Sequence, residues 1–250
     1  MIRFKATLVN ELEKLHKNKK VLAAIILSIV FIILGQIFIL LLRNNFGLKG
    51  ASSTEFPLLV LSTLINTLLP LFIALITIDS FSGEFSQNTM KISLTKPVTR
   101  LKLFTVKIVA IIIFIFMTLM TIMLFSIISG IIFNTNSFTV ENLIKIVISY
   151  VVTLMPMTIL CLIIVLFANI LKNGIAVFFL SILVFIISKV LAIFFPTYSG
   201  ILFTSMIGWH ALWIMDNIPY LKIFRNFMMM LSYAIILFTA GYYIFDKKDL

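Results

Sequence analysis

Six long apolar runs restrict what this 250-residue chain can fold into. A hydrocarbon core of about 30 Å needs roughly 20 apolar residues at the rise of an α-helix. The runs comprise residues 21–42, 57–78, 108–133, 146–170, 175–195 and 227–245. Because backbone polar groups must be satisfied inside the membrane, each run predicts a membrane-spanning helix. We therefore expect an all-α membrane protein with six transmembrane helices, built as a single domain over residues 1–250.

The composition excludes a water-soluble enzyme. Hydrophobic residues make up 62% of the chain and charged residues 12%, whereas a soluble domain is about half apolar and a quarter charged. The single cysteine, Cys161, and the two separated histidines disfavour disulfides and metal sites. No GxxxxGK[ST] phosphate-binding loop is present. We expect no metal or cofactor on this chain, and any ATP must be handled by another chain.

The basic residues predict the orientation in the membrane. The chain has 20 Lys and Arg against 9 Asp and Glu, a net charge of +11. With six spans, fourteen of the basic residues fall on the side that holds both termini and the second and fourth connections. The positive-inside rule places both termini in the cytoplasm, and the charge is then explained without nucleic acid. We expect a multi-pass protein of the cell membrane, in a bacterial plasma membrane.

The residues before the first span predict an amphipathic helix. Phe4, Leu8, Leu12 and Leu15 recur at helical spacing and line one face. The polar residues, among them Glu11, are expected largely on other faces. Such a helix lies on the cytoplasmic surface with its apolar face on membrane lipid. A frayed basic tail is the alternative.

Residues 196–226 are apolar but broken by Pro and Gly, and contain both tryptophans, Trp209 and Trp213. Because tryptophan favours the membrane interface, we expect short re-entrant or interfacial helices on the outer side, before the last span. A seventh span is the alternative, and it would place the basic C-terminal tail outside.

Three residues inside the apolar runs are of types that are unusual within a membrane span. Pro70 and Pro156 each remove a backbone donor and favour a kink, which either fits helices together or opens a lumen. Lys189 lies within the fifth run, where its long side chain can extend toward the outer interface. An ion relay is the alternative, but no carboxylate lies within the runs to support it.

The connection Asp79 to Lys107 is long for an inner loop. Asp79, Ser80 or Ser82 is expected to cap a helix that Glu84 and Phe85 continue. The proline after Lys96 should end this helix. A helix held between two spans in this way suits docking to a partner.

This connection resembles the E(x)nGT(x)nLLxxPVSRxxxxxxK segment of ABC-2 type permeases, the membrane subunits of ABC exporters. The matching residues are Glu84, Thr89, Met90, Leu94, Pro97, Arg100 and Lys107. Asn88 replaces the usual glycine and Thr99 the usual serine. The N-terminal helix, the six runs and the ending Phe245 to Leu250, similar to FxxxD(L/I), extend the resemblance over the chain.

The resemblance implies a coupling helix within residues 79–100 that binds a cytoplasmic ATP-binding subunit. The residues expected to contact that subunit are Asp79, Phe81, Glu84, Phe85, Thr89 and Met90. The residues expected to anchor the segment to the membrane are Pro97, Arg100, Lys102 and Lys107. The alternative is that Glu84 and Arg100 only stabilise the loop itself. The partner would hold ATP and Mg²⁺, and a second permease copy, identical or related, would complete the pathway.

The resemblance implies an exporter of hydrophobic or amphipathic substrates, such as peptides, antimicrobials or drugs. Two alternatives remain from the sequence. One is a stand-alone membrane immunity or binding protein. The other, less supported because the acidic residues and histidines are isolated, is an intramembrane enzyme.

Overall fold

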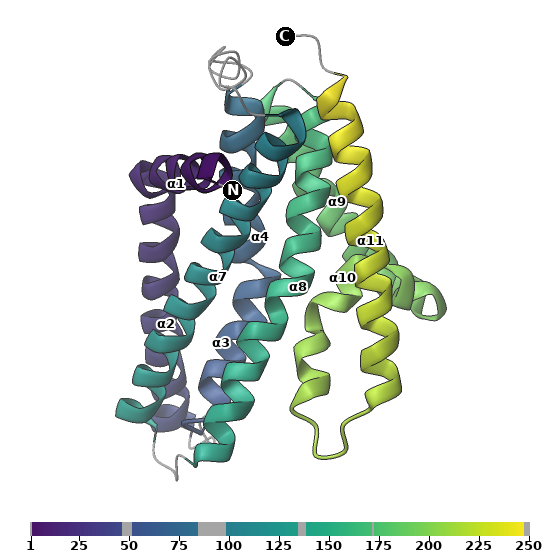
Figure 1. The fold of residues 1–250 in the computed structure, drawn as a ribbon. Coiled ribbons are helices and arrows are strands. Elements are labelled where there is room, and N and C mark those ends of the chain that lie inside the picture. The colour runs from purple at the N-terminus through teal and green to yellow at the C-terminus, as the bar shows by residue number, and fades with distance from the viewer. Residues whose placement is uncertain (1, 47–51, 85–98, 135–138, 172, 248–250) are drawn as a thin grey trace.

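The structure, a computed structural model, describes residues 2–46, 52–84, 99–134, 139–171 and 173–247, and all its regular elements are helices. The elements are α1 (Ile2–Lys17), α2 (Lys19–Phe46), α3 (Glu55–Asn66), α4 (Leu68–Ile78), the π-helix η1 (Asp79–Gly83), α7 (Arg100–Phe133), α8 (Val140–Ile170), α9 (Gly174–Phe194), the 3₁₀-helix η2 (Pro196–Ile201), α10 (Phe203–Met206), the 3₁₀-helix η3 (Ile207–Trp213) and α11 (Tyr220–Asp246) (Figure 1).

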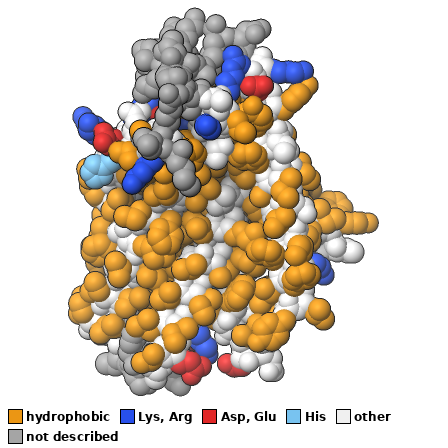
Figure 2. All heavy atoms as spheres, viewed as in Figure 1, with side chains coloured by type: hydrophobic (Ala, Val, Ile, Leu, Met, Phe, Trp, Pro, Cys, Tyr) orange, Lys and Arg blue, Asp and Glu red, His pale blue; other side chains and the backbone are white. Residues whose placement is uncertain are grey.

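The predicted all-α membrane fold is confirmed. Within the described residues, five helices (α2, α7, α8, α9 and α11) are long and apolar enough to cross a membrane, and the bent pair α3 and α4 makes a sixth candidate when its two helices are counted as one span. Figure 2 shows charged side chains gathered at the two ends of the molecule, with a broad hydrophobic band between them. This distribution is what a lipid bilayer requires of a protein surface.

Helix α1 lies across one end of the bundle, and α2 runs from there along the bundle (Figure 1). The same end holds η1, the start of α7 and the C-terminal end of α11. We call this the α1 end. Both ends of the described chain therefore lie on one side, as an even number of spans requires.

Helix α8 forms the centre of the bundle. It packs against α11, α7, α4, α9 and η3. About half of the most apolar stretch of α7 and of α8 is buried, against 11% in α9 and α11. The outer helices therefore leave most of their apolar surface uncovered by the chain itself.

The second predicted span is broken. Helices α3 and α4 meet at Thr67 with a bend of 48°. Pro70 explains the position of the break, because a proline cannot donate to the carbonyl four residues earlier, that of Asn66, and its ring crowds that carbonyl. Pro156, in contrast, lies inside the unbroken helix α8.

Three spans begin earlier than their apolar runs predict. Helix α7 begins at Arg100 instead of residue 108, because Thr99 caps it by accepting from the Lys102 amide. Helix α8 begins at Val140 instead of residue 146, with Thr139 as a similar cap. Helix α11 begins at Tyr220 instead of residue 227. Hydropathy marks the apolar part of a helix, while capping side chains decide where the helix begins.

Residues 196–226 contain short helices followed by the start of α11. None of η2, α10 and η3 exceeds seven residues, so no seventh span forms there. Trp209 is buried and its indole N–H donates to the Val152 carbonyl oxygen of α8, 3.0 Å away. The segment is thus packed on the bundle.

Candidate functional site

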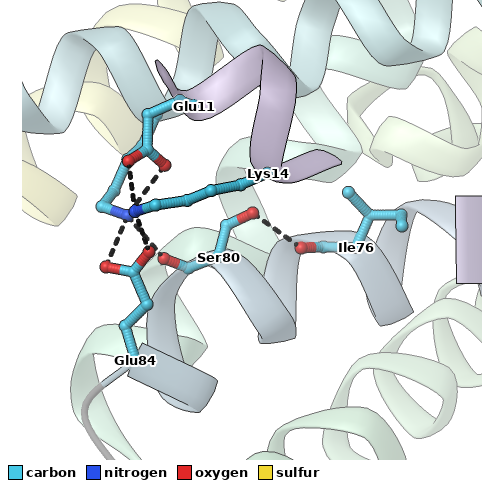
Figure 3. A network of polar contacts seen from close by, with 6 residues as sticks. Glu11, Lys14, Ile76, Ser80 and Glu84 are labelled. Atoms are coloured by element: carbon cyan, nitrogen blue, oxygen red, sulfur yellow. Dashed lines mark hydrogen bonds and ion pairs between the residues drawn. The ribbon is translucent and has the colours of Figure 1, made fainter. Parts of the chain in front are cut away.

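A buried lysine lies at the centre of a charge network at the α1 end. Lys107 of α7 is 1% exposed. Its Nζ lies 3.1 Å from Glu11 Oε2 and 2.8 Å from Glu84 Oε2, and donates to the Ser80 carbonyl oxygen at 3.0 Å. Three separate elements, α1, α7 and the segment after η1, therefore meet at one ammonium group (Figure 3).

Lys14 closes the network from the outside. Its Nζ lies 2.7 Å from Glu11 Oε1 and 3.0 Å from Glu84 Oε1. Each carboxylate thus lies between two lysines, as Figure 3 shows for Glu11 and Glu84. We call Glu11, Lys14, Glu84 and Lys107 the charge network.

The electrostatics of this network favour its charged form. Burial alone would raise the pKa of the Glu11 carboxyl, but the charge of Lys107 and hydrogen bonds from both lysines outweigh burial and hold that pKa below its ordinary value. Burial would likewise lower the pKa of Lys14, but the bond to Glu11 and the charge of Glu84 raise it. Glu11 and Lys14 are therefore stabilised in their charged forms.

The expected place of Glu11 on a polar face of α1 is wrong. Glu11 is 5% exposed and lies between Leu8 and Leu15 on the face that packs against α7. Phe4, Glu11 and Leu15 are separated by seven and four residues, which puts all three on one stripe of a helix. The sequence therefore contained a signal for this carboxylate, a charge within an apolar stripe.

The apolar stripe of α1 packs on the protein. Leu15 belongs to the core, and Leu8 and Leu12 pack against it, while Phe4 is partly buried. The stripe was expected to face lipid. It covers α7 instead, because α1 is held there by the charge network.

A second ionic contact ties the start of α2 to η1. The Asp79 carboxylate lies 2.7 Å from Lys20 Nζ and accepts a hydrogen bond of 3.0 Å from the Asn18 side-chain amide. Asn18 also accepts from the Lys20 backbone amide, at the turn between α1 and α2. Asn18 and Lys20 were not among the predicted site residues.

The predicted helix cap at Asp79, Ser80 or Ser82 is wrong. The backbone continues from α4 into the π-helix η1 without a break, and Asp79 has ordinary helical dihedral angles. The Ser80 hydroxyl donates to the Ile76 carbonyl oxygen, within the same helix (Figure 3). Helix α4, η1 and Glu84 thus form one continuous helical segment. π-helical turns are often found at functional sites.

Phe81 points into the core. It is fully buried, with its ring centroid 5.8 Å from that of Phe104 and 6.3 Å from that of Phe245. Its predicted contact with an ATP-binding subunit stays a prediction. Phe81 locks η1 against α7 and α11 at the α1 end.

The predicted anchoring residues separate into three groups. Lys107 is buried and bonded to Glu11, Glu84 and Ser80 within the protein, and its predicted anchoring role stays a prediction. Arg100 donates to the Asp246 carbonyl oxygen at the end of α11, and the Lys102 side chain is exposed. Phe85, Thr89, Met90 and Pro97 lie outside the described residues, where their predicted roles stay predictions.

The described residues contain no group of three or more His, Cys, Asp and Glu side chains placed to hold a metal ion. The charge network also lacks a nucleophile with an adjacent base. The role of the charge network is structural, because it fastens α1, α7 and Glu84, which precedes the connection 85–98, to one another.

The fold and this site define a multi-pass helical membrane protein whose charge network lies at the α1 end of the bundle. Residues 7–188 match the family model described as ABC-2 family transporter protein. The chain therefore belongs to the ABC-2 transporter family, a family of transport membrane proteins. No curated protein matches it.

Proposed function

We propose that this chain is the permease subunit of an ATP-driven ABC exporter, with ATP and Mg²⁺ held by a separate cytoplasmic subunit. The observation that carries this proposal is the charge network, which lies where the connection 85–98 begins. Membership of the ABC-2 transporter family supports a partner ATPase. The excess of basic residues at the α1 end supports its cytoplasmic placement.

The network gives the connection a rigid stem. Removing one member of a buried ion pair costs about 3–5 kcal/mol, because the other charge is left unpaired. A partner that moves residues 85–98 must therefore move Glu84, α1 and α7 together. Phe81, packed against Phe104 and Phe245, extends the connection to α11. Motion of the connection is then transmitted to the spans. Coupling of this kind requires that the contacts between the subunits differ between two states of the transporter.

In this proposal Glu84 and Arg100 act through positioning. Glu84 holds the start of the connection 85–98, and Arg100 holds its end against Asp246 of α11. Residues 85–98 are then the part of the connection that we propose contacts the partner. The apolar outer faces of α9 and α11 suit a second permease copy. A hydrophobic or amphipathic substrate, exported from the cell, suits the apolar walls between the spans.

The test is to purify the chain from its native membrane with its partner. We expect an ATP-binding subunit to be retained, and Glu84→Ala and Arg100→Ala to keep the complex but reduce transport per ATP hydrolysed in reconstituted vesicles. Glu141→Gln is the matched control, because Glu141 forms an exposed pair with Lys145 at the opposite end of α8 and α7.

Three outcomes contradict the proposal. Unchanged coupling in both variants would remove the role of the charge network. A chain that retains no ATP-binding subunit and still protects cells against an antimicrobial substrate would be a stand-alone immunity or binding protein. Turnover of a substrate by the purified chain alone would make it an enzyme.

A further inference from the structure

A cavity of about 180 Å³ opens where the second span is broken. Its wall comes from α3, α4, α8 and α9 and is mostly apolar, with Leu71, Leu160 and Ile186 among its residues. Asn66 and Thr67, at the break itself, supply polar groups. The cavity lies far from the charge network, so it is a separate feature of the molecule.

The break determines the polar end of this cavity. The Asn66 side-chain amide donates to the Ser62 carbonyl oxygen at 2.6 Å, and the Thr67 hydroxyl donates to the Thr63 carbonyl oxygen at 2.8 Å. One amide N–H of Asn66 and the hydroxyl of Thr67 are therefore used within the helix. The Asn66 side-chain oxygen remains directed at another partner, and discontinuous helices of this kind form binding sites in transporters.

That partner is Lys189 of α9. Its Nζ donates to Asn66 Oδ1 at 2.6 Å and lies 5.0 Å from the centroid of the Phe185 ring, which lines the cavity. Lys189 thus bonds to the second span, across from its own helix. In the part of the chain that the structure describes, Lys189 forms no ion pair. An ammonium group has three donors, and Asn66 takes one of them.

A cation without an anion is costly within a membrane span, at least about 2.5–3.5 kcal/mol on insertion scales. Such a residue is a functional candidate by default, and a ligand that carries a negative charge would offset this cost. The size and polarity of the neighbouring cavity determine what the uncharged part of that ligand can be. Since an apolar cavity of roughly 150 Å³ holds benzene, this one accepts an aromatic ring or a short branched chain.

We propose that the cavity binds a small amphipathic acid, with its apolar group among Leu71, Leu160 and Ile186 and its carboxylate on Lys189 Nζ. A neutral apolar molecule would leave the ammonium unpaired, and a two-chain phospholipid exceeds the volume. As a statement about transported substrate, the inference rests on the proposed exporter function. As a statement about binding, it needs neither ATP nor a partner.

The experiment uses the full-length chain in lipid nanodiscs and a photoreactive octanoic acid that carries a diazirine at its far end. We expect light-dependent labelling of α4, α8 or α9 at cavity residues, mapped by mass spectrometry. The methyl ester of the same probe is the matched control for partitioning into lipid. We expect about tenfold weaker labelling by the ester, because a charge-assisted hydrogen bond is lost.

Three variants test the site. Lys189→Gln is expected to weaken labelling about tenfold, and Lys189→Arg to retain it, since the positive charge remains. Ile186→Trp, at the exposed edge of the cavity, is expected to block labelling by filling the space. Lys145→Gln, near the start of α8 and outside the cavity lining, is the control and should label as the parent does. Reaction of the buried Cys161 with a thiol dye on heating checks that each variant is folded.

Competition distinguishes the two sources of such an acid. Unlabelled octanoate stands for a fatty acid, and N-acetylphenylalanine for the C-terminal residue of a peptide, with N-acetylphenylalaninamide as its neutral control. Displacement by either acid, and not by the amide, supports the proposal and names the source. Equal labelling by acid and ester, unchanged labelling in folded Lys189→Gln, or labels outside the cavity would overturn it. Such a failure leaves the charge network and its ATPase coupling unaffected.

Discussion

Two lysines lie within the helical bundle, and their surroundings are opposite. Lys107 is fully buried at the α1 end, between the carboxylates of Glu11 and Glu84. Lys189 lies partly buried in the membrane-spanning part of α9, where it donates a hydrogen bond to the neutral amide of Asn66. The Lys107 ammonium is neutralised by carboxylates of the protein, whereas we propose that the Lys189 ammonium is neutralised by the carboxylate of a ligand.

The difference teaches how charge is used in an apolar protein. Where two carboxylates meet a lysine, the desolvation cost is offset and the elements that bear the charges become fixed to one another. Where a lysine stands beside an apolar cavity, the cost persists in the free protein and becomes available to a ligand. We therefore assign a mechanical role to Lys107 and a binding role to Lys189.

The largest expected effect is that of Lys107→Met. The substitution leaves Glu11 and Glu84 buried with Lys14 alone, and should lower the free energy of unfolding by about 3–5 kcal/mol. The measurement is thermal unfolding in detergent, followed by the reaction of Cys161, which is buried in the native protein. Adding Glu11→Gln and Glu84→Gln to Lys107→Met should recover much of the loss. No recovery would mean that the lysine acts through packing and not through charge.

Acidification should weaken the same network by a smaller amount. Because the pKa of Glu11 is lowered on folding, its contribution is present above the ordinary carboxyl pKa of about 4.3 and is lost as the pH falls through the lower folded value. The difference in unfolding temperature between the parent and Glu11→Gln should therefore shrink as the pH falls below about 4.3. A difference that is the same at pH 7 and in acid would contradict the ionic role of Glu11.

Lys189→Met should have little effect on stability, in contrast to Lys107→Met. It removes one hydrogen bond, worth about 1 kcal/mol, and also the cost of holding an ammonium within a span. These changes oppose one another, so the unfolding temperature should stay the same or rise. A loss as large as that of Lys107→Met would show that Lys189 has an anionic partner in the resting protein, and would break the comparison.

The smallest expected effect is that of Glu141→Gln, which calibrates the others. Glu141 and Lys145 form an i,i+4 pair 3.1 Å apart, but the Glu141 side chain is 77% exposed. Pairs of this kind contribute about 0.5 kcal/mol or less, because water screens them. An unfolding temperature within experimental error of the parent is expected. A larger loss would show that the stability contributed by charge pairs in this protein does not depend on how buried they are.

The sequence predicted the spans well because a bilayer imposes a length of apolar residues that can be read directly from the chain. It predicted the starts of α7 and α8 less well, since Thr99 and Thr139 extend these helices before the apolar runs. The described part of the connection 79–107 lies at the α1 end. Phe81 and Lys107 are buried there within the protein, which the local sequence did not indicate.

The sequence by itself determined a helical membrane protein with both ends on one side and the resemblance to ABC-2 permeases, because hydropathy, charge and a local motif are properties of consecutive residues. Only the tertiary structure placed Glu11 and Lys107, 96 positions apart, in one ion pair. Only it placed Lys189 beside Asn66, 123 positions away, at the cavity. Burial and pairing depend on how helices pack, and no local pattern contains that information.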